Sequence, residues 1–242
     1  MRELTTDRPD KTESPYTVDA GHYQIELDLL NYTQDCTDKA VQTLAIAPSN
    51  LKVGLFNNVD LQFIVETYTI LRTSGHDPQA HETVSGFGDV LIRCKTNFWG
   101  NDGGTTAGGM MPFLKLPTGA TELGNGAVEG GIIFPLAITL PQEWSMGLMT
   151  EVDHLRNSDS SNYHQEFINS ITFGHGIIGQ LAGYLEFFSS ISSERDVEWI
   201  GTVDFGLTYN LRSNVQLDAG VNIGVTRAAD DLNSFVGLSV RF

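Results

Sequence analysis

The sequence predicts an all-β fold: a closed antiparallel transmembrane β-barrel of about 12 strands, with short periplasmic turns and longer extracellular loops. Three observations predict it. Apolar and polar side chains alternate along most of the chain, short connections alternate with long ones, and the chain ends on an aromatic residue, Phe242. Alternation with a period of two residues indicates strands with two different faces, which a helix cannot produce.

The last segment, 231–242, shows this alternation clearly. One face carries Leu232, Val236, Leu238, Val240 and Phe242, and the other carries Asn233, Phe235, Gly237, Ser239 and Arg241. A strand of this kind that ends on an aromatic carboxylate resembles the closing strand of a bacterial outer-membrane barrel. Its apolar face would then meet lipid, and we expect it to close on the strand that begins at Tyr23.

Two earlier segments support the same fold. Segment 215–225 places apolar residues at six consecutive alternate positions, and segment 199–209 carries Trp199 and Tyr209 near opposite ends of its apolar face. Aromatic residues favour the two membrane interfaces, because their rings are apolar while their N–H and O–H groups stay hydrated. In a soluble sandwich the same two residues could lie at the rim.

The remaining strands follow, with a less regular pattern towards the N-terminus. They are predicted at 23–29, 43–56, 59–65, 90–98, 106–116, 132–138, 144–152, 163–173 and 181–191. The total is then about twelve, and an even number is what single-chain bacterial barrels have.

The connections between these strands alternate in length. The short ones, rich in turn residues, are 57–58, 100–104, 141–143, 176–180 and 212–214. The longer polar ones are 33–41, 73–85, 117–129, 155–162, 192–198 and 227–231. Both termini then fall on the side of the short turns. A barrel pairs short periplasmic turns with longer outer loops, whereas a soluble sandwich has no reason to keep this alternation.

Composition permits a barrel and excludes several other classes. The longest apolar run, 132–138, is interrupted by Pro135, and a spanning helix needs about 20 apolar residues. The formal charge of −16 argues against nucleic acid and against a polybasic surface for anionic lipid. Cys36 and Cys94 lie far apart and in no metal-ligand spacing. We expect no cofactor, no metal and no nucleic-acid partner.

The N-terminus is charged and lacks the apolar region of a signal peptide. A mature secreted chain would look the same, so this observation is neutral to mildly adverse for a barrel. We expect two parts, a flexible N-terminal segment at 1–18 and the transmembrane barrel at 19–242. The polar stretch 5–16 could cross the lumen as a plug or lie in the periplasm, and we expect it in the periplasm or at the mouth of the lumen.

Charged side chains occupy the face opposite the apolar one, so we expect them to line the lumen. They are Glu26, Asp28, Asp60, Gln62, Glu66, Arg93, Lys95, Lys115, Glu151, Asp153, Glu166, Asp204, Asp218 and Arg241. A soluble sandwich would place these residues on its solvated outside. About twelve strands give a barrel of intermediate width, and salt bridges would narrow it, so we expect a narrow or partly occluded lumen.

Three stretches carry a resemblance to a known family. They are RPDKTESPYTVDAGHYQIE at 8–26, GFGDVLIRCKTNFWG at 86–100 and PFLKLPTG at 112–119. The sequence resembles the meta-pathway phenol-degradation family of outer-membrane transporter-like β-barrel proteins, over most of its length and through to Phe242. The resemblance implies an outer-membrane barrel that passes small, often aromatic or apolar, molecules. The chain departs from typical members at Cys36 and Cys94 and in lacking its leader.

Enzymatic signals are weak. The histidines His22, His76, His81, His154, His164 and His175 sit at no HxxxH or HxH spacing. A surface phospholipase would need a serine, a histidine and an orienting residue exposed together, and His154 near Ser158 and Ser160 is the nearest candidate. We expect structural or solvated histidines and no enzyme.

We therefore expect a porin-like outer-membrane channel of a Gram-negative bacterium, for passive uptake of small molecules, aromatic or apolar ones among them. Its expected partners are outer-membrane lipid and lipopolysaccharide, a small-molecule solute, and the barrel-assembly machinery through the C-terminal strand. Two alternatives stay open: a closed structural or adhesive barrel with acidic surface loops, and a soluble β-sandwich binding module.

Overall fold

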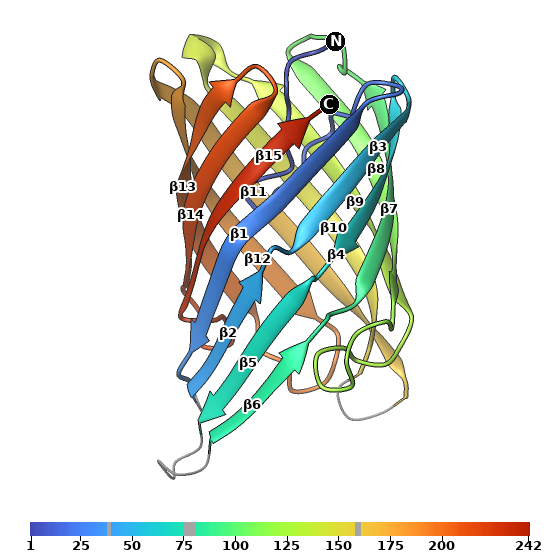
Figure 1. Ribbon diagram of the computed structural model, residues 1–242, viewed down its shortest axis with the longest axis vertical. Helices are drawn as coiled ribbons and strands as arrows, with labels where there is room; N and C mark the ends of the chain where they lie inside the picture. Colours follow the sequence, from blue (N-terminus) through green and yellow to red (C-terminus); the bar gives the residue numbers. More distant parts are fainter. Residues whose placement is uncertain (38–39, 75–80, 158–160) are drawn as a thin grey trace.

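The computed structural model describes residues 1–37, 40–74, 81–157 and 161–242. Its strands form one sheet in the order β15-β14-β13-β12-β11-β10-β9-β8-β7-β4-β3-β1-β2-β5-β6, and β15 also pairs with β1 (Figure 1). This last pairing closes the sheet into a barrel. A soluble β-sandwich is therefore the wrong interpretation.

The strands are antiparallel throughout. Their bounds are β1 Tyr23–Asp35, β2 Ala40–Ile46, β3 Ser49–Phe56, β4 Val59–Val65, β5 Tyr68–Ser74, β6 His81–Gly86, β7 Val90–Trp99, β8 Thr106–Leu116, β9 Glu129–Thr139, β10 Ser145–Arg156, β11 Tyr163–Ile178, β12 Leu181–Ser192, β13 Ile200–Arg212, β14 Val215–Gly224 and β15 Leu232–Arg241. Within the described residues, one 3-10 turn, η1 at Pro141–Glu143, lies between β9 and β10.

Three crossings of the wall are interrupted strands. β2 and β3 are separated by Ala47, at φ 55°, and Pro48. β4 and β5 are separated by residues 66–67, and β6 and β7 by residues 87–89. Each pair continues one crossing, because β3 pairs with β4 while β2 pairs with β5. The fifteen labelled strands thus form twelve crossings, which confirms the predicted barrel.

Several strands extend past their predicted ends. β1 continues to Asp35 and β11 to Ile178, and β5 and β6 occupy most of the predicted connection 73–85. The apolar alternation stops where a strand leaves the hydrocarbon, since both of its faces can then be hydrated. The backbone ladder continues there without that signal.

The C-terminal strand closes the barrel on the strand that begins at Tyr23, as predicted from the sequence. β15 pairs with β1 in a register that sets Arg241 opposite Gln24, and the Phe242 N–H donates to the Tyr23 carbonyl at 2.8 Å. A bulge between Asp28 and Leu30 shifts this register by one residue. Both termini lie at the end of the short turns, and the longer connections lie at the other end (Figure 1).

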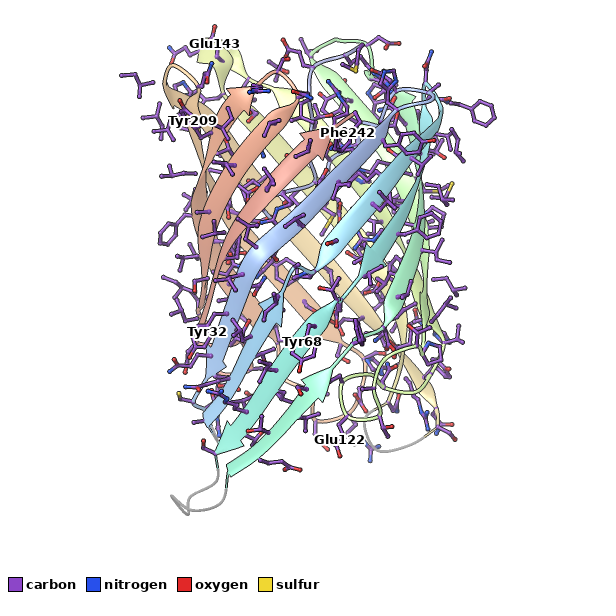
Figure 2. All side chains as sticks on the ribbon, in the orientation of Figure 1. Tyr32, Tyr68, Glu122, Glu143, Tyr209 and Phe242 are labelled. Carbon is purple, nitrogen blue, oxygen red and sulfur yellow. The ribbon has the colours of Figure 1, made fainter. Side chains whose placement is uncertain are left out.

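The barrel is apolar outside and polar inside. Along β13 the outward Phe205 is 44% exposed and the inward Asp204 is fully buried. Tyr209 and Phe242 lie near the short-turn end and Tyr32 and Tyr68 nearer the other end (Figure 2), so aromatic residues border the apolar band on both sides. Among the described residues, no helix is long and apolar enough to cross a bilayer.

Candidate functional site: the barrel lumen

The residues predicted to line the lumen are buried or partly buried inside the barrel, except Glu66, which is more exposed. The buried ones are Glu26, Asp28, Asp60, Gln62, Lys95, Asp153, Asp204, Asp218 and Arg241. Partly buried are Arg93, Lys115, Glu151 and Glu166. Glu66 is exposed and lies in the break between β4 and β5, where its carbonyl accepts a hydrogen bond from Gly88 N–H. That these side chains form a permeation path stays a prediction.

Residues 5–16 of the N-terminal segment, which were expected in the periplasm or at the lumen mouth, lie inside the lumen among wall side chains. Asp7 forms two of the ion pairs between this segment and the barrel wall. Its carboxylate accepts hydrogen bonds from the ammonium groups of Lys52 on β3 and Lys95 on β7. Lys52 also pairs with Glu26 on β1.

The other charges of the segment alternate between the two sides of the barrel. Arg8 pairs with Asp218 on β14 and Asp28 on β1, both at 2.6 Å. Lys11 reaches Asp204 on β13 at 3.1 Å. Glu13 pairs with Arg93 on β7, the strand that also carries Lys95. The segment therefore crosses the lumen and is held by ion pairs to both walls.

The backbone of the segment is anchored as well. The Lys11 and Thr12 N–H groups donate to the two oxygens of Glu186 at 2.8 and 2.7 Å. Further along, Val18 N–H donates to Asp60 at 2.9 Å, and Asn97 Nδ2 donates to the Pro15 carbonyl at 2.9 Å. Hydrogen bonds to charged groups are roughly twice as strong as neutral ones. Wall side chains thus satisfy the polar backbone of a segment that has no secondary structure.

Sequence reasoning missed several of these lumen residues. Glu186 lies on the face opposite Leu185 and Phe187, and the alternation of β12 could have identified it. Lys52 lies in the predicted strand 43–56, whose faces were not assigned. The segment's own charges carry no periodic signal, so only the three-dimensional structure places them.

Burial and charge set the protonation of two groups in the segment. Burial alone would raise the pKa of Asp7, but the Lys52 and Lys95 charges outweigh it and hold the pKa well below its usual range. Asp10 shows the opposite behaviour: burial and the nearby Glu186 carboxylate raise its pKa to about 8. Asp10 is therefore mostly protonated at neutral pH, which limits its repulsion with Glu186.

One part of the inner wall is apolar. Met111, Ile133 and Met149 form a buried cluster on β8, β9 and β10, against which Phe113 and Ile168 pack. Glu13 N–H contacts the Met149 sulfur at 3.4 Å. The segment therefore passes an apolar patch as well as charges.

Two cavities lie on either side of the segment. The outer one, of about 450 Å³, is at the long-loop end and is lined by β1, β12, β13, β14, β15, the 228–230 loop and Lys11. The inner one, of about 280 Å³, is lined by β10, β11, β12, β13, residues 6 and 8–10 of the segment and Gln216 of β14. Arg8, Pro9 and Asp10 line the inner cavity and Lys11 lines the outer one, so residues 8–11 separate two spaces along the same side of the lumen.

The structure adds no support for the enzymatic signals of the sequence. Ser158, Ser160 and His76 lie outside the described residues, so the phospholipase arrangement is not described. His154 stacks on Tyr163 and bonds Gln165. Within the described ranges, no group of three or more His, Cys, Asp or Glu side chains is placed to hold a metal ion.

Comparison with known proteins identifies a family for this chain. A family model described as "Putative MetA-pathway of phenol degradation" matches residues 6–242. The chain belongs to this family. The resemblance found in the three sequence stretches is thereby confirmed, and it covers the N-terminal segment from residue 6 as well as the barrel. A search of curated proteins finds no match.

Solved structures share the fold. The COG4313 outer membrane channel from Pseudomonas putida F1 is 13% identical, with a TM-score of 0.67 and coverage of 95% of this chain and 98% of that one. The NanC porin is 11% identical, with a TM-score of 0.55 and coverage of 90% and 98%. The beta domain of the Bordetella autotransporter BrkA is 14% identical, with a TM-score of 0.54 and coverage of 93% and 100%.

Identities this low establish a common fold and nothing finer. That fold is a closed antiparallel barrel with an apolar outer band, which is the architecture of bacterial outer-membrane proteins. The predicted fold and the predicted outer-membrane location are therefore confirmed.

Proposed function

We propose that this protein is a channel for passive uptake of small molecules, aromatic or apolar ones among them. In this proposal residues 19–242 form the barrel, and residues 1–18 form a movable segment that controls passage. The charged residues of the inner wall hold that segment and line the path when it moves. The proposal assigns no catalysis and no cofactor.

The observation that carries the proposal is the pair of cavities separated by residues 8–11. A barrel built only as a scaffold would gain stability from a filled interior, since cavities lose packing contacts. Here spaces remain on both sides of a segment that has no secondary structure. Ion pairs hold this segment, and they can exchange for water without unfolding the wall.

Solute flux tests the proposal against a closed structural or adhesive barrel. The full chain is reconstituted into liposomes, and swelling with arabinose is compared with empty vesicles. For phenol, which crosses plain bilayers unaided, vesicles with an outer leaflet of lipopolysaccharide are used. Permeation above the empty vesicles for either solute supports a channel. No flux of either solute, with a correctly folded barrel, would support the closed alternative.

The expected partners follow from the surface. Lipid meets the apolar band, and lipopolysaccharide meets the polar loops at the long-loop end. We further propose that the barrel-assembly machinery recognises the C-terminal strand, because Phe242 is 65% exposed at the end of the chain.

Phe242→Glu tests this recognition. We expect the amount of folded protein in the membrane to fall several-fold, while flux per folded molecule is retained. Phe56→Glu is the matched control, because Phe56 is also 65% exposed and also lies at the short-turn end. Equal membrane levels of the two variants would contradict a specific role for the terminal residue.

A further inference from the structure

A third cavity lies at the short-turn end of the barrel, where both ends of the chain are found (Figure 1). Its volume of about 560 Å³ is within the range of small-molecule sites. The wall contributes Arg241 of β15 and Arg212, the last residue of β13, and the N-terminal segment contributes Arg2 and Glu3. Among the described residues that line it, three arginines therefore share the space with one carboxylate.

Arg241 carries a buried charge whose partners are neutral. The residue is only 4% exposed, and its Nη1 and Nη2 donate to the carbonyls of Glu3 at 2.9 Å and Arg2 at 2.7 Å. In the described part of the chain its Nε has no hydrogen-bond partner, and no carboxylate forms an ion pair with it. Buried charges are usually paired, because burial removes the water that stabilises them. The cavity wall therefore holds an uncompensated positive charge.

The other charged groups around the cavity reduce this positive charge only in part. Arg2 is paired with Asp19, 2.6 Å from its Nε, and lies 3.5 Å from the exposed carboxylate of Asp102. Arg212 is exposed and makes no ion pair within the described ranges. Glu3 is also exposed, so water screens its carboxylate. Two of the three arginines thus lack a charged partner.

We propose that this cavity binds a small oxyanion, a phosphate or carboxylate group, at the periplasmic mouth of the barrel. Arg212 contacts the anion from the end of β13, and the Asn210 amide and the Ser213 hydroxyl, which also line the cavity, donate to its remaining oxygens. Arg241 and Arg2 supply positive charge from the inner side. Guanidinium groups suit such ligands, because two of their N–H groups match two anion oxygens. The inference goes beyond the proposed channel, since it holds whether or not the barrel conducts.

Isothermal titration calorimetry of the full chain in maltoside micelles, which contain no phosphate, tests the site. Sodium phosphate and sodium acetate are titrated at neutral pH and constant ionic strength, with sodium chloride as the reference. Arg212→Gln should weaken binding about tenfold, the effect of one hydrogen bond between charged groups. Arg241→Gln should weaken it by a similar factor. Arg195→Gln removes an exposed arginine of a loop at the long-loop end, so this matched control should bind like the unchanged chain.

The order of affinities identifies the ligand group. Tighter binding of phosphate than of acetate assigns the site to phosphate groups, and the reverse order assigns it to carboxylates. The site would be refuted if neither anion bound more tightly than chloride, or if Arg212→Gln and Arg195→Gln had the same affinity. Migration on gels before and after boiling confirms that each variant is a folded barrel. Arg212 is exposed at the end of its strand, so its replacement keeps the test valid even if Arg241→Gln fails to assemble.

Discussion

Asp7 is the residue that joins the N-terminal segment to the cationic side of the lumen. It accepts from Lys52 and Lys95, both of which are buried in the wall. Removing one partner of a buried ion pair costs about 3–5 kcal/mol, because the other charge is left uncompensated. Lys52 keeps Glu26 as a second partner, and Lys95 keeps the carboxylate of its cross-strand neighbour Asp60 nearby, so this cost is partly offset.

Replacing Asp7 should therefore release the segment. We expect Asp7→Asn to raise the open probability in planar bilayers about tenfold or more, since 1.4 kcal/mol already corresponds to a factor of ten. Glu3→Gln is the control, because it removes a carboxylate of the same segment whose side chain is exposed. Indistinguishable recordings from the two variants would show that the Asp7 ion pairs do not hold the segment.

Asp10 predicts a pH dependence with a definite sign. Its pKa is raised from 3.8 to about 8 when the segment is docked, by burial and the Glu186 carboxylate, with Glu13 also nearby. Docking therefore favours the protonated form. The free-energy penalty for docking the segment is absent below pH 3.8, the pKa of the free carboxyl. It grows between pH 3.8 and about 8 and is complete above about 8.

The open probability should accordingly rise as the pH rises to about 8 and then level off. Asp10→Asn is neutral at every pH, so it should stay closed and flatten this profile. Single-channel recordings from pH 5 to pH 9 make the comparison, at about one-unit steps. A wild-type profile that falls with rising pH, or a variant with the same slope, would exclude Asp10 as the titrating group.

At the scale of elements, the strands were predictable because each crossing of the wall has a lipid face and a lumen face. The breaks at residues 47–48, 66–67 and 87–89 were not predicted. Pro48 lacks the N–H that a ladder needs, and this could have marked the first break. Gly88 could likewise have marked the third break, because glycine inside a strand indicates a bulge or a close contact, whereas the second break has no comparable local signal.

The barrel wall determines folding and the N-terminal segment limits conductance, and deletion of the segment distinguishes the two contributions. Closure depends on β1 and β15, neither of which includes residues 1–22. We expect a chain lacking residues 2–14 to fold, to keep its resistance to detergent until boiled, and to conduct several-fold more than the full chain.

A variant with residues 2–14 replaced by glycine and serine at equal length is the control. It keeps the chain but loses the ion pairs, so it should conduct like the deletion. Unchanged conductance in both variants would refute the idea that the segment occludes the lumen.

At the scale of the whole molecule, the sequence predicted the polar lumen but not what fills it. Arg8 and Asp218 are 210 residues apart in the chain, and pairing over such a distance leaves no local pattern. The strands reveal their faces because lipid imposes the alternation. The segment contacts neither lipid nor a regular ladder, so its place is decided by charge complementarity between elements that the sequence separates.

One arc of the described inner wall is acidic, and the cations lie on other strands, where further carboxylates stand among them. Cations gather on β3 and β7, with Lys52, Lys95 and Arg93. Carboxylates gather on β10 to β14, with Glu151, Asp153, Glu166, Glu186, Asp204 and Asp218. Further carboxylates line β1, β4 and β9, so acidic groups outnumber cations on the described wall.

An opened lumen should therefore select cations. We expect the chain lacking residues 2–14 to favour potassium over chloride several-fold, measured as a reversal potential across a KCl gradient near 0.1 M, where screening acts over about 10 Å. Asp153→Asn in that background should reduce the preference, because Asp153 is a buried carboxylate of the acidic arc. Asp102→Asn, exposed in the turn between β7 and β8, should not change it. An anion-selective pore would mean that ions avoid the acidic arc and pass along the cationic side.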